Sequence, residues 1–186
     1  MAEAQATLPR ILETATQLFI EHGYHGLAMR EIAAGVGVSK PALYYHFRDK
    51  ESLFLAVLEH HLGQVVKLVR EAAERPTVRA GLEDFLRAFF DLPVPTRQMI
   101  RLSSQEIVHL SREARDTFGQ RYAHDFVHGL RDMLAAGMVR GELRTHDAGL
   151  AVRMLLGLML PFVASESEEG QLALSILDVY WNGVGT

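Results

Sequence analysis

Residues 32–50 of the chain read IAAGVGVSKPALYYHFRDK. This stretch predicts a helix that ends in a sharp turn at Gly37, followed by a short helix that Ser39 caps and whose first turn accommodates Pro41. Leu43 and Phe47 lie four residues apart, so they share the buried face of the short helix. Two helices joined in this way have the layout of a helix-turn-helix, in which the second helix enters the major groove of DNA.

The opposite face of the short helix carries side chains that suit DNA. Lys40 can reach a guanine edge or a phosphate, and Ala42 is short enough to let the backbone approach and touch a thymine methyl. Tyrosine hydroxyls and the His46 ring suit phosphate oxygens, and the helix dipole favours a phosphate at Lys50. The alternative is a helical hairpin with two exposed tyrosines, although paired aromatics beside Lys and His are unusual on a solvated face. The predicted DNA-binding residues are Arg30, Ser39, Lys40, Pro41, Ala42, Tyr44, Tyr45, His46 and Lys50.

Composition limits the remaining choices. The chain has 186 residues, of which 48% are hydrophobic and none is cysteine, so disulfides, thiolate zinc sites and a cysteine nucleophile are excluded. The net charge of -4 means that DNA affinity depends on where the cations lie rather than on bulk charge. The longest apolar run, 154–164, is shorter than the ~20 residues of a membrane span, and residues 1–9 lack a signal-peptide pattern. We therefore expect a cytoplasmic protein without membrane contact.

Apolar residues recur at helical spacing nearly throughout, which predicts an all-α fold of about nine helices. An N-terminal domain of residues 1–52 is expected to precede an effector-binding and dimerisation domain of residues 53–186. Expected caps and breaks are Gly23, Gly37, Ser39, Asp49, Thr77, Thr96, Ser111, Gly137, Gly141 and Thr145. They divide the N-terminal part of the chain into a helix around 11–22 and helices over 28–35, 40–47 and 49–69. The rest is expected to hold a helix over 78–91, a helix that begins at 96, helices over 111–137 and 145–163, and a last helix that ends at about 181.

A dense set of residues links this N-terminal region to a known family. The set is Ala15, Leu18-Phe19, Gly23-Tyr24, Ile32-Ala33, Gly37-Val38-Ser39, Leu43-Tyr44-Tyr45-His46-Phe47, Lys50-Glu51 and Leu53. Through these, residues 10–58 resemble the DNA-binding domain of TetR-type (tetracycline-repressor-like, AcrR-type) transcriptional regulators. The resemblance implies a homodimer on a roughly palindromic DNA operator, with a C-terminal domain that holds a small-molecule pocket and the dimer interface. The chain departs from the family at Leu27-Ala28, where a Ser or Thr usually caps the second helix; losing that cap costs about 1 kcal/mol and a phosphate contact.

The C-terminal part offers candidates for both remaining sites. Apolar and aromatic side chains on the middle helices together predict a pocket for an apolar or aromatic effector, although each residue alone is more often plain core. The predicted pocket residues are His61, Phe85, Phe89, Met99, His109, Phe118, Tyr122, Phe126 and Met159. Wide apolar bands on the last two helices predict a four-helix dimer interface, the alternative being burial within the monomer. The predicted interface residues are Leu155, Met159, Phe162, Leu172, Ile176, Val179 and Tyr180.

These features predict a repressor that a ligand releases from its operator, with no catalytic residue, metal or cofactor. An activator, or a regulator that needs its ligand to bind DNA, remains an alternative. Two further alternatives are a metal-dependent enzyme and a helical protein that sequesters apolar ligands. The enzyme is disfavoured because His124 and His128 have the spacing of a metal-binding pair but no evident third ligand.

Overall fold

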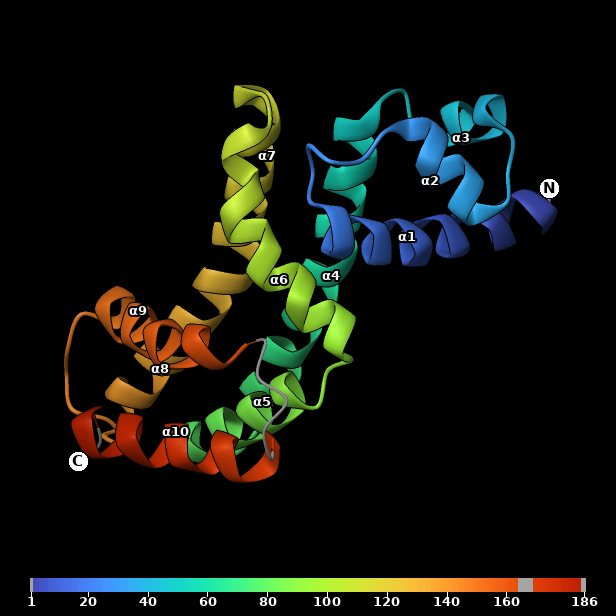
Figure 1. Cartoon of the computed structure of the whole chain (residues 1–186). Coiled ribbons are helices and arrows are strands. Elements are labelled where there is room, and N and C mark those ends of the chain that lie inside the picture. Colours follow the sequence, from blue (N-terminus) through green and yellow to red (C-terminus); the bar gives the residue numbers. More distant parts are fainter. Residues whose placement is uncertain (1, 164–168, 185–186) are drawn as a thin grey trace. The chain divides into compact units, whose positions relative to one another are not determined.

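The computed structural model describes residues 2–163 and 169–184, and these form ten α-helices without a β-strand (Figure 1). The all-α prediction is therefore confirmed. Short 3₁₀ segments, Ile107–His109 and Leu160–Phe162, follow α6 and α9, and a π-helix, Tyr122–Val127, joins α7 to α8. The helices are α1 Ala2–His22, α2 Met29–Val36, α3 Lys40–His46, α4 Lys50–Ala73, α5 Val78–Phe90, α6 Val94–Glu106, α7 Arg112–Arg121, α8 His128–Val139, α9 Ala148–Met159 and α10 Glu169–Val184.

The chain divides into two compact units. Unit 1 contains residues 1–61 and 98–118, and unit 2 contains residues 62–97 and 119–186. This division differs from the predicted one at residue 52, because most of α6 and the start of α7 group with the N-terminal helices. The boundaries between the units fall inside α4, α6 and α7.

Unit 1 has a core made mainly by the predicted apolar stripes. On α1, Ile11, Ala15 and Phe19 are fully buried, and the Phe19 ring meets the Phe54 ring of α4 edge-on at 4.8 Å between centroids. The predicted turn of the helix-turn-helix is also present: Gly37 ends α2 at φ 74°, a left-handed conformation that glycine adopts without strain. The sequence pattern thus reports this part of the fold correctly.

Unit 2 is held by close helix contacts at small residues. α5 packs on α10 and α8, and α9 packs on α8 and α10. A Cβ atom built on Gly81 of α5 would lie 2.5 Å from the backbone oxygen of Ala72, so only glycine permits this approach of α5 to α4. The Tyr180 hydroxyl of α10 donates to the Ala151 carbonyl of α9 at 3.1 Å, and burial raises the pKa of Tyr180 to about 12.

Helix ends differ from the predictions in three places. The expected helix over 111–137 is interrupted by the π-helix, so the described residues form ten helices rather than nine. α6 begins at Val94 instead of Thr96, because Pro95 fits the first turn, where its missing N–H is not needed. α9 begins after Asp147, whose carboxylate accepts the Leu150 N–H at 2.5 Å, and not at Thr145.

Helix α4 alone among the described helices is long and apolar enough to cross a membrane by length and composition. Its apolar side chains lie along one side and are buried in the protein. They include Leu53, Phe54, Val57, Leu58, Leu62, Val65, Val66 and Val69. Burial in the core explains the hydropathy of this helix.

Candidate nucleic-acid interface

Helix α3 is fixed at both ends and on one face. The Ser39 hydroxyl accepts the Ala42 N–H at 3.2 Å, and Pro41 lies in the first turn, as predicted. Leu43 is fully buried, and Phe47, which ends the helix, is 8% exposed. Because these two side chains hold the inner face, the outer face of α3 is presented to solvent as one rigid surface.

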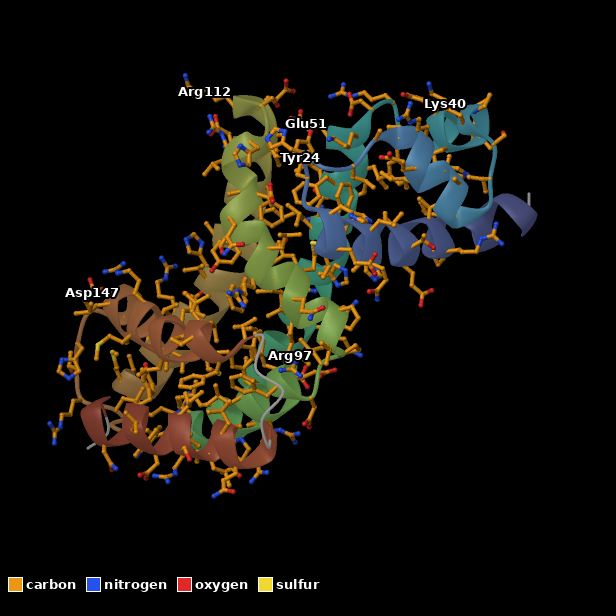
Figure 2. All side chains as sticks on the ribbon, viewed as in Figure 1. Tyr24, Lys40, Glu51, Arg97, Arg112 and Asp147 are labelled. Carbon is orange, nitrogen blue, oxygen red and sulfur yellow. The ribbon has the colours of Figure 1, made fainter. Side chains whose placement is uncertain are left out.

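That outer face contains the side chains predicted for DNA recognition. Tyr45 is 83% exposed and Tyr44 is 42% exposed, values that are high for aromatic residues. Figure 2 shows the Lys40 side chain on α3. The Lys40 ammonium lies 5.7 Å from the centre of the Tyr44 ring, and the His46 ring meets the Tyr45 ring edge-on at 5.4 Å. Both contacts are made between side chains of the same short helix, which leaves these side chains open to a ligand.

Two arginines add positive charge beside this face. The side chains of Arg30, in the first turn of α2, and Arg48, between α3 and α4, are each 79% exposed. Arg30 lies 4.0 Å from Glu31, and Arg48 lies 3.1 Å from Asp49. At such exposure these ion pairs are weak, so both guanidinium groups are accessible to a phosphate. Arg48 was not among the predicted site residues, although its place in the α3–α4 link was a usable signal.

The predicted phosphate contact by Lys50 needs correction. Its ammonium donates to the backbone carbonyls of Tyr24 at 2.5 Å and Leu27 at 2.9 Å, and it lies 4.4 Å from the centre of the Tyr24 ring. Burial lowers the pKa of Lys50, while Glu106 and Glu31 oppose the shift. Lys50 therefore ties the start of α4 to the α1–α2 loop. No local pattern signals this contact, because the partners lie more than twenty residues away.

The start of α2 shows how the chain manages without the usual Ser or Thr. Ala28 occupies the N-cap position and provides no side-chain cap. Instead, the Glu31 carboxylate accepts the Ala28 N–H at 2.7 Å, which is one half of a capping box. The carboxylate satisfies the backbone but places a negative charge beside Arg30.

The predicted effector residues separate into different environments. Four aromatic rings of unit 2 come together. The centre of the Phe85 ring lies 6.0 Å from that of Phe89 and 6.3 Å from that of Phe126. The centres of the Phe126 and Tyr122 rings are 5.4 Å apart. Tyr122 is 37% exposed and its three neighbours are buried. We call these four residues the aromatic cluster. Tyr122 and Phe126 belong to the π-helix, a rare form that is frequent at functional sites.

The other predicted effector residues lie elsewhere. Met99 and Phe118 are buried in unit 1, and Met159 is buried in unit 2. His109 was predicted to line the pocket. It is exposed and meets the His25 ring edge-on at 4.4 Å, so it is not an interior polar group. A cleft of about 260 Å³ between α4 and α5 is lined by none of the predicted residues. Its walls are Leu68, Glu71, Ala72, Arg75, Asp84, Arg87, Ala88 and Asp91.

His61 is buried within unit 1 in an unusual way. Its Nε2 atom lies 2.9 Å from the hydroxyl of Thr16, and that hydroxyl donates to the Leu12 carbonyl at 2.7 Å. Since the hydroxyl proton points to Leu12, the His61 ring proton is on Nε2 and Nδ1 is an acceptor. Nδ1 is buried with no hydrogen-bond partner in the structure. Burial, followed by the nearby His60, lowers the pKa of His61 to about 4.

The predicted dimer residues also need correction. Leu155, Met159, Ile176 and Tyr180 are at most 5% exposed, so they belong to the core of unit 2 and are not available to a partner. Phe162 and Val179 are exposed as expected, and Leu172 is partly exposed. We give the name α9–α10 apolar face to the large apolar side chains that are at least 40% exposed on α9, on the 3₁₀ segment after it and on α10. They are Leu150, Met154, Leu160, Phe162, Leu174 and Val179.

Histidine pairs in the described residues do not gather into a metal site. His124 and His128 are 6.1 Å apart between ring centroids, and His124 Nδ1 lies 2.8 Å from the Asp125 carboxylate. No group of three His, Asp or Glu side chains arranged to hold a metal ion occurs in the part of the chain that the structure describes.

The three N-terminal helices, the left-handed turn at Gly37 and the exposed outer face of α3 define a helix-turn-helix protein of the DNA-binding class. Residues 11–57 match "Bacterial regulatory proteins, tetR family", and residues 75–161 match "Tetracyclin repressor-like, C-terminal domain". The chain belongs to the tetR family, which confirms the resemblance.

Relatives of known role match part of the chain. It is 43% identical over 94 residues to the HTH-type transcriptional activator FasR of Mycolicibacterium smegmatis, covering 50% of this chain and 43% of FasR. It is 39% identical over 74 residues to the HTH-type transcriptional repressor AcnR of Corynebacterium glutamicum, covering 40% of this chain and 39% of AcnR. The chain thus spans about two fifths of these curated relatives. The structure is similar to the crystal structure of the TetR family transcriptional regulator PfmR from Thermus thermophilus, with a TM-score of 0.80 and 28% identity over 93% of this chain and 97% of PfmR.

Proposed function

We propose that the chain is a cytoplasmic, sequence-specific DNA-binding transcriptional regulator that acts as a homodimer and responds to an apolar or aromatic small molecule. The observation that carries this proposal is the outer face of α3, where Tyr45 is 83% exposed on a helix whose other side is fixed by the fully buried Leu43. A rigid helix with exposed hydrogen-bonding side chains suits the major groove. Membership of a family of bacterial regulatory proteins supports the same function and gives no support to an enzyme.

Within this function, the side chains divide by chemistry. Lys40 on α3 faces base edges, and Ala42 allows the close approach of the backbone. The hydroxyls of Tyr44 and Tyr45 suit phosphate oxygens beside them. Arg30 and Arg48 contact phosphates and set the orientation of the helix, which takes over the part first assigned to Lys50. These cations explain how a chain with a net charge of -4 binds DNA, since the positive charge lies where the phosphates would be.

Dimerisation is supported by the α9–α10 apolar face. Six large apolar side chains are exposed on α9, on the 3₁₀ segment after it and on α10, and a large exposed apolar patch is typical of an interaction site. A second copy of the chain offers the same face, and two copies would make an isologous four-helix interface. The dimer would place two α3 helices on two half-sites of a palindromic operator.

The aromatic cluster is the proposed effector site. Its rings are packed at 5.4 to 6.3 Å, and the partly exposed Tyr122 gives it a solvent-facing side. An apolar or aromatic molecule that inserts there would favour one arrangement of the flanking helices over another, and by linkage it would change DNA affinity. We propose that the effector releases DNA. A regulator that activates transcription is the second candidate, because FasR, 43% identical over its matched region, is an activator.

The test is selection of random DNA duplexes by the purified protein at about 0.1–0.15 M salt, followed by affinity measurements on the enriched sequence. We expect an inverted repeat, and we expect Lys40→Ala to lower the affinity about 10-fold or more, as base contacts of this kind are worth about 1–3 kcal/mol. Lys67→Ala is the matched control, because it removes the same charge from an exposed side chain of unit 2. Failure to enrich any sequence, or equal losses in both variants, contradicts the proposed function.

A further inference from the structure

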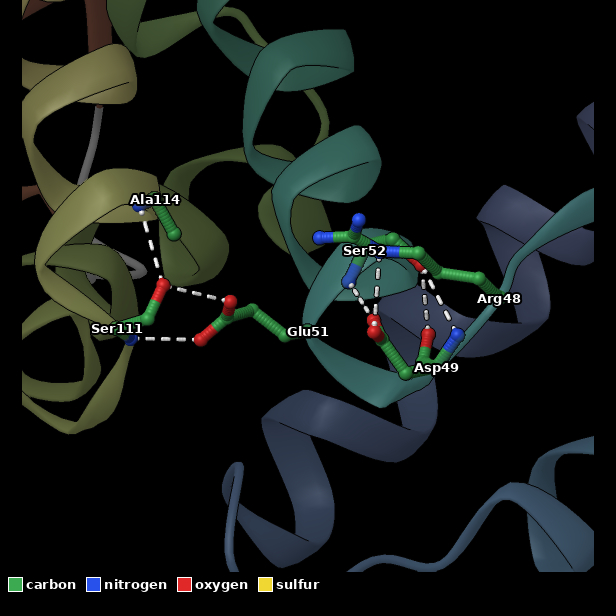
Figure 3. Close-up of polar contacts among 6 residues, drawn as sticks. All are labelled: Arg48, Asp49, Glu51, Ser52, Ser111 and Ala114. Carbon is green, nitrogen blue, oxygen red and sulfur yellow. Dashed lines mark hydrogen bonds and ion pairs between the residues drawn. The ribbon is translucent and has the colours of Figure 1, made fainter.

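A short polar contact joins two helices of unit 1 that are sixty residues apart in sequence. Glu51 lies in the first turn of α4, and its carboxylate accepts the backbone N–H of Ser111 at 2.6 Å and the Ser111 hydroxyl at 2.8 Å (Figure 3). Both carboxylate oxygens are used, so the contact fixes the direction of the side chain as well as its distance. We call this contact the α4–α7 latch.

Ser111 is at the same time the N-cap of α7. Its hydroxyl oxygen accepts the Ala114 N–H at 3.2 Å while its proton goes to Glu51. The latch therefore holds the end of α7 itself, because the first turn of that helix is organised by the same hydroxyl that Glu51 binds. A charged acceptor makes both hydrogen bonds stronger than neutral ones.

The other end of the latch is close to the DNA-reading helix. Only Phe47, Arg48 and Asp49 separate α3 from α4, and this link is capped: the Asp49 carboxylate accepts the Ser52 N–H at 2.7 Å, and the Asp49 N–H donates to the Ser52 hydroxyl at 3.2 Å. The backbone hydrogen bond from Ser52 is the main cause that lowers the pKa of Asp49, so the cap persists at neutral pH. A displacement of the first turn of α4 is therefore passed on to α3.

Two further contacts accompany the latch at the same corner of unit 1. The His25 ring, in the α1–α2 loop, meets the His109 ring at 4.4 Å, and a Cβ atom on Gly23 would lie 3.0 Å from a carboxylate oxygen of Glu106. The segment 106–111 thus touches both the loop before α2 and the start of α4. Beyond Phe118, α7 leaves unit 1 and continues into the π-helix that carries two members of the aromatic cluster.

We propose that the α4–α7 latch is a positioning contact that fixes α3 to α7, and that it thereby sets the separation of the two α3 helices in a dimer and the spacing of half-sites that the dimer accepts. This inference rests on the proposed function. Glu51 and Ser111 do not touch DNA; they act through α4. Without the latch, each α3 still binds a half-site, since its own packing on Leu43 and Phe47 is unchanged. What is lost is the fixed distance between two such helices.

The experiment compares duplexes that differ only in spacing. The selected operator, the same operator with one base pair inserted between its half-sites, and a single half-site are titrated with the full-length protein in about 0.1–0.15 M salt. One inserted base pair moves a half-site by about 3.4 Å and turns it by about 35°, so a rigid dimer loses affinity. We expect this loss to be about 3- to 10-fold smaller in Ser111→Ala and in Glu51→Gln than in the original protein, the range expected from one or two exposed charged hydrogen bonds.

Controls separate positioning from general damage. Half-site affinity corrects for the negative charge that Glu51→Gln removes near DNA. Ser111→Thr keeps the cap and the hydroxyl donor, and we expect it to restore the full spacing penalty. Ser104→Ala removes a comparable exposed hydroxyl, one that donates only to the Arg101 carbonyl of its own helix, and we expect no effect on spacing.

The outcomes are distinct. An unchanged spacing penalty in both Ser111→Ala and Glu51→Gln, with operator binding intact, overturns the latch. An equal loss of affinity for half-site and full operator also overturns it, because that result reports damage to α3 itself. Absence of binding to any duplex by the original protein overturns the proposed function instead.

Discussion

The buried imidazole of His61 makes the stability of this protein depend on pH in a predictable way. The folded-state pKa of about 4 lies below the ordinary value of 6.5, so the unfolded chain binds a proton more readily than the folded protein does. The stabilising effect of a neutral His61 is complete above about pH 6.5 and is lost as the pH falls toward 4. The full loss amounts to about 3 kcal/mol, and about 2 kcal/mol of it falls between pH 7 and pH 5.

The perturbation that isolates this effect is His61→Gln. Glutamine does not titrate, and its amide can still donate to the Thr16 hydroxyl as Nε2 does now. We expect the free energy of unfolding to fall between pH 7 and pH 5 by about 2 kcal/mol more in the original protein than in this variant. The assay is urea unfolding at both pH values and at one fixed protein concentration, because the stability of a dimer depends on concentration.

An exposed histidine provides the control. His146→Gln removes one imidazole from the surface and should leave the pH dependence of the original protein in place. If His61→Gln unfolds with the same pH dependence as the original protein, then His61 is not held neutral by burial, and the assignment of Nδ1 as an acceptor without a partner is wrong.

Three further changes test the packing and the polar contacts. Val179→Asp puts a carboxylate at the most exposed position of the α9–α10 apolar face, so we expect a folded monomer by light scattering, with dimer affinity reduced about 100-fold or more. Gly81→Ala forces a Cβ atom against a backbone oxygen and should lower the unfolding free energy by about 1–3 kcal/mol, whereas Gly63→Ala, at a helical position open to solvent, should leave it equal or slightly higher. Lys50→Met leaves two carbonyls of the α1–α2 loop without their donor and should lower the free energy of unfolding by about 1–3 kcal/mol. Arg48→Ala should weaken DNA binding without changing the free energy of unfolding. A loss of stability in Arg48→Ala, or none in Lys50→Met, contradicts the exchange of roles between these two cations.

Local chemistry accounts for what the sequence predicted well. Ser39 and Thr77 cap α3 and α5 because their hydroxyls accept an N–H three residues later, a rule that needs no knowledge of the rest of the chain. Gly23 and Gly37 end their helices with positive φ for an equally local reason. The face of α3 was predictable on the same ground, since the four-residue spacing of its buried side chains determines which residues point outward.

Contacts between distant residues account for what the sequence did not predict. The role of Lys50 depends on carbonyls of the α1–α2 loop, and the Val78 N–H at the start of α5 donates to Glu142 at 2.6 Å, far along the chain. The prediction of the dimer interface was wrong in part for a related reason. Leu155 and Val179 both belong to apolar bands, and only the packing of α9 on α10 decides that the first is buried and the second is 62% exposed.

The π-helix illustrates a third kind of limit, and it bears on how an effector signal would travel. Residues 112–139 read as one continuous helix, and no local rule asks for a wider turn at 122–127. A π-helix holds one residue more than the α-helix it interrupts, so its conversion to α would rotate everything beyond it by about 100° relative to what precedes it. Before this segment, the start of α7 is held to α4 by Glu51, and within the segment Phe126 packs against Phe85. A ligand that changes the packing of Phe126 therefore acts on the one stretch of this helix where a small change in hydrogen bonding gives a large change in direction. Coupling between an effector and a DNA-reading helix requires an element with two discrete arrangements, and the π-helix and its α-helical form would be two such arrangements.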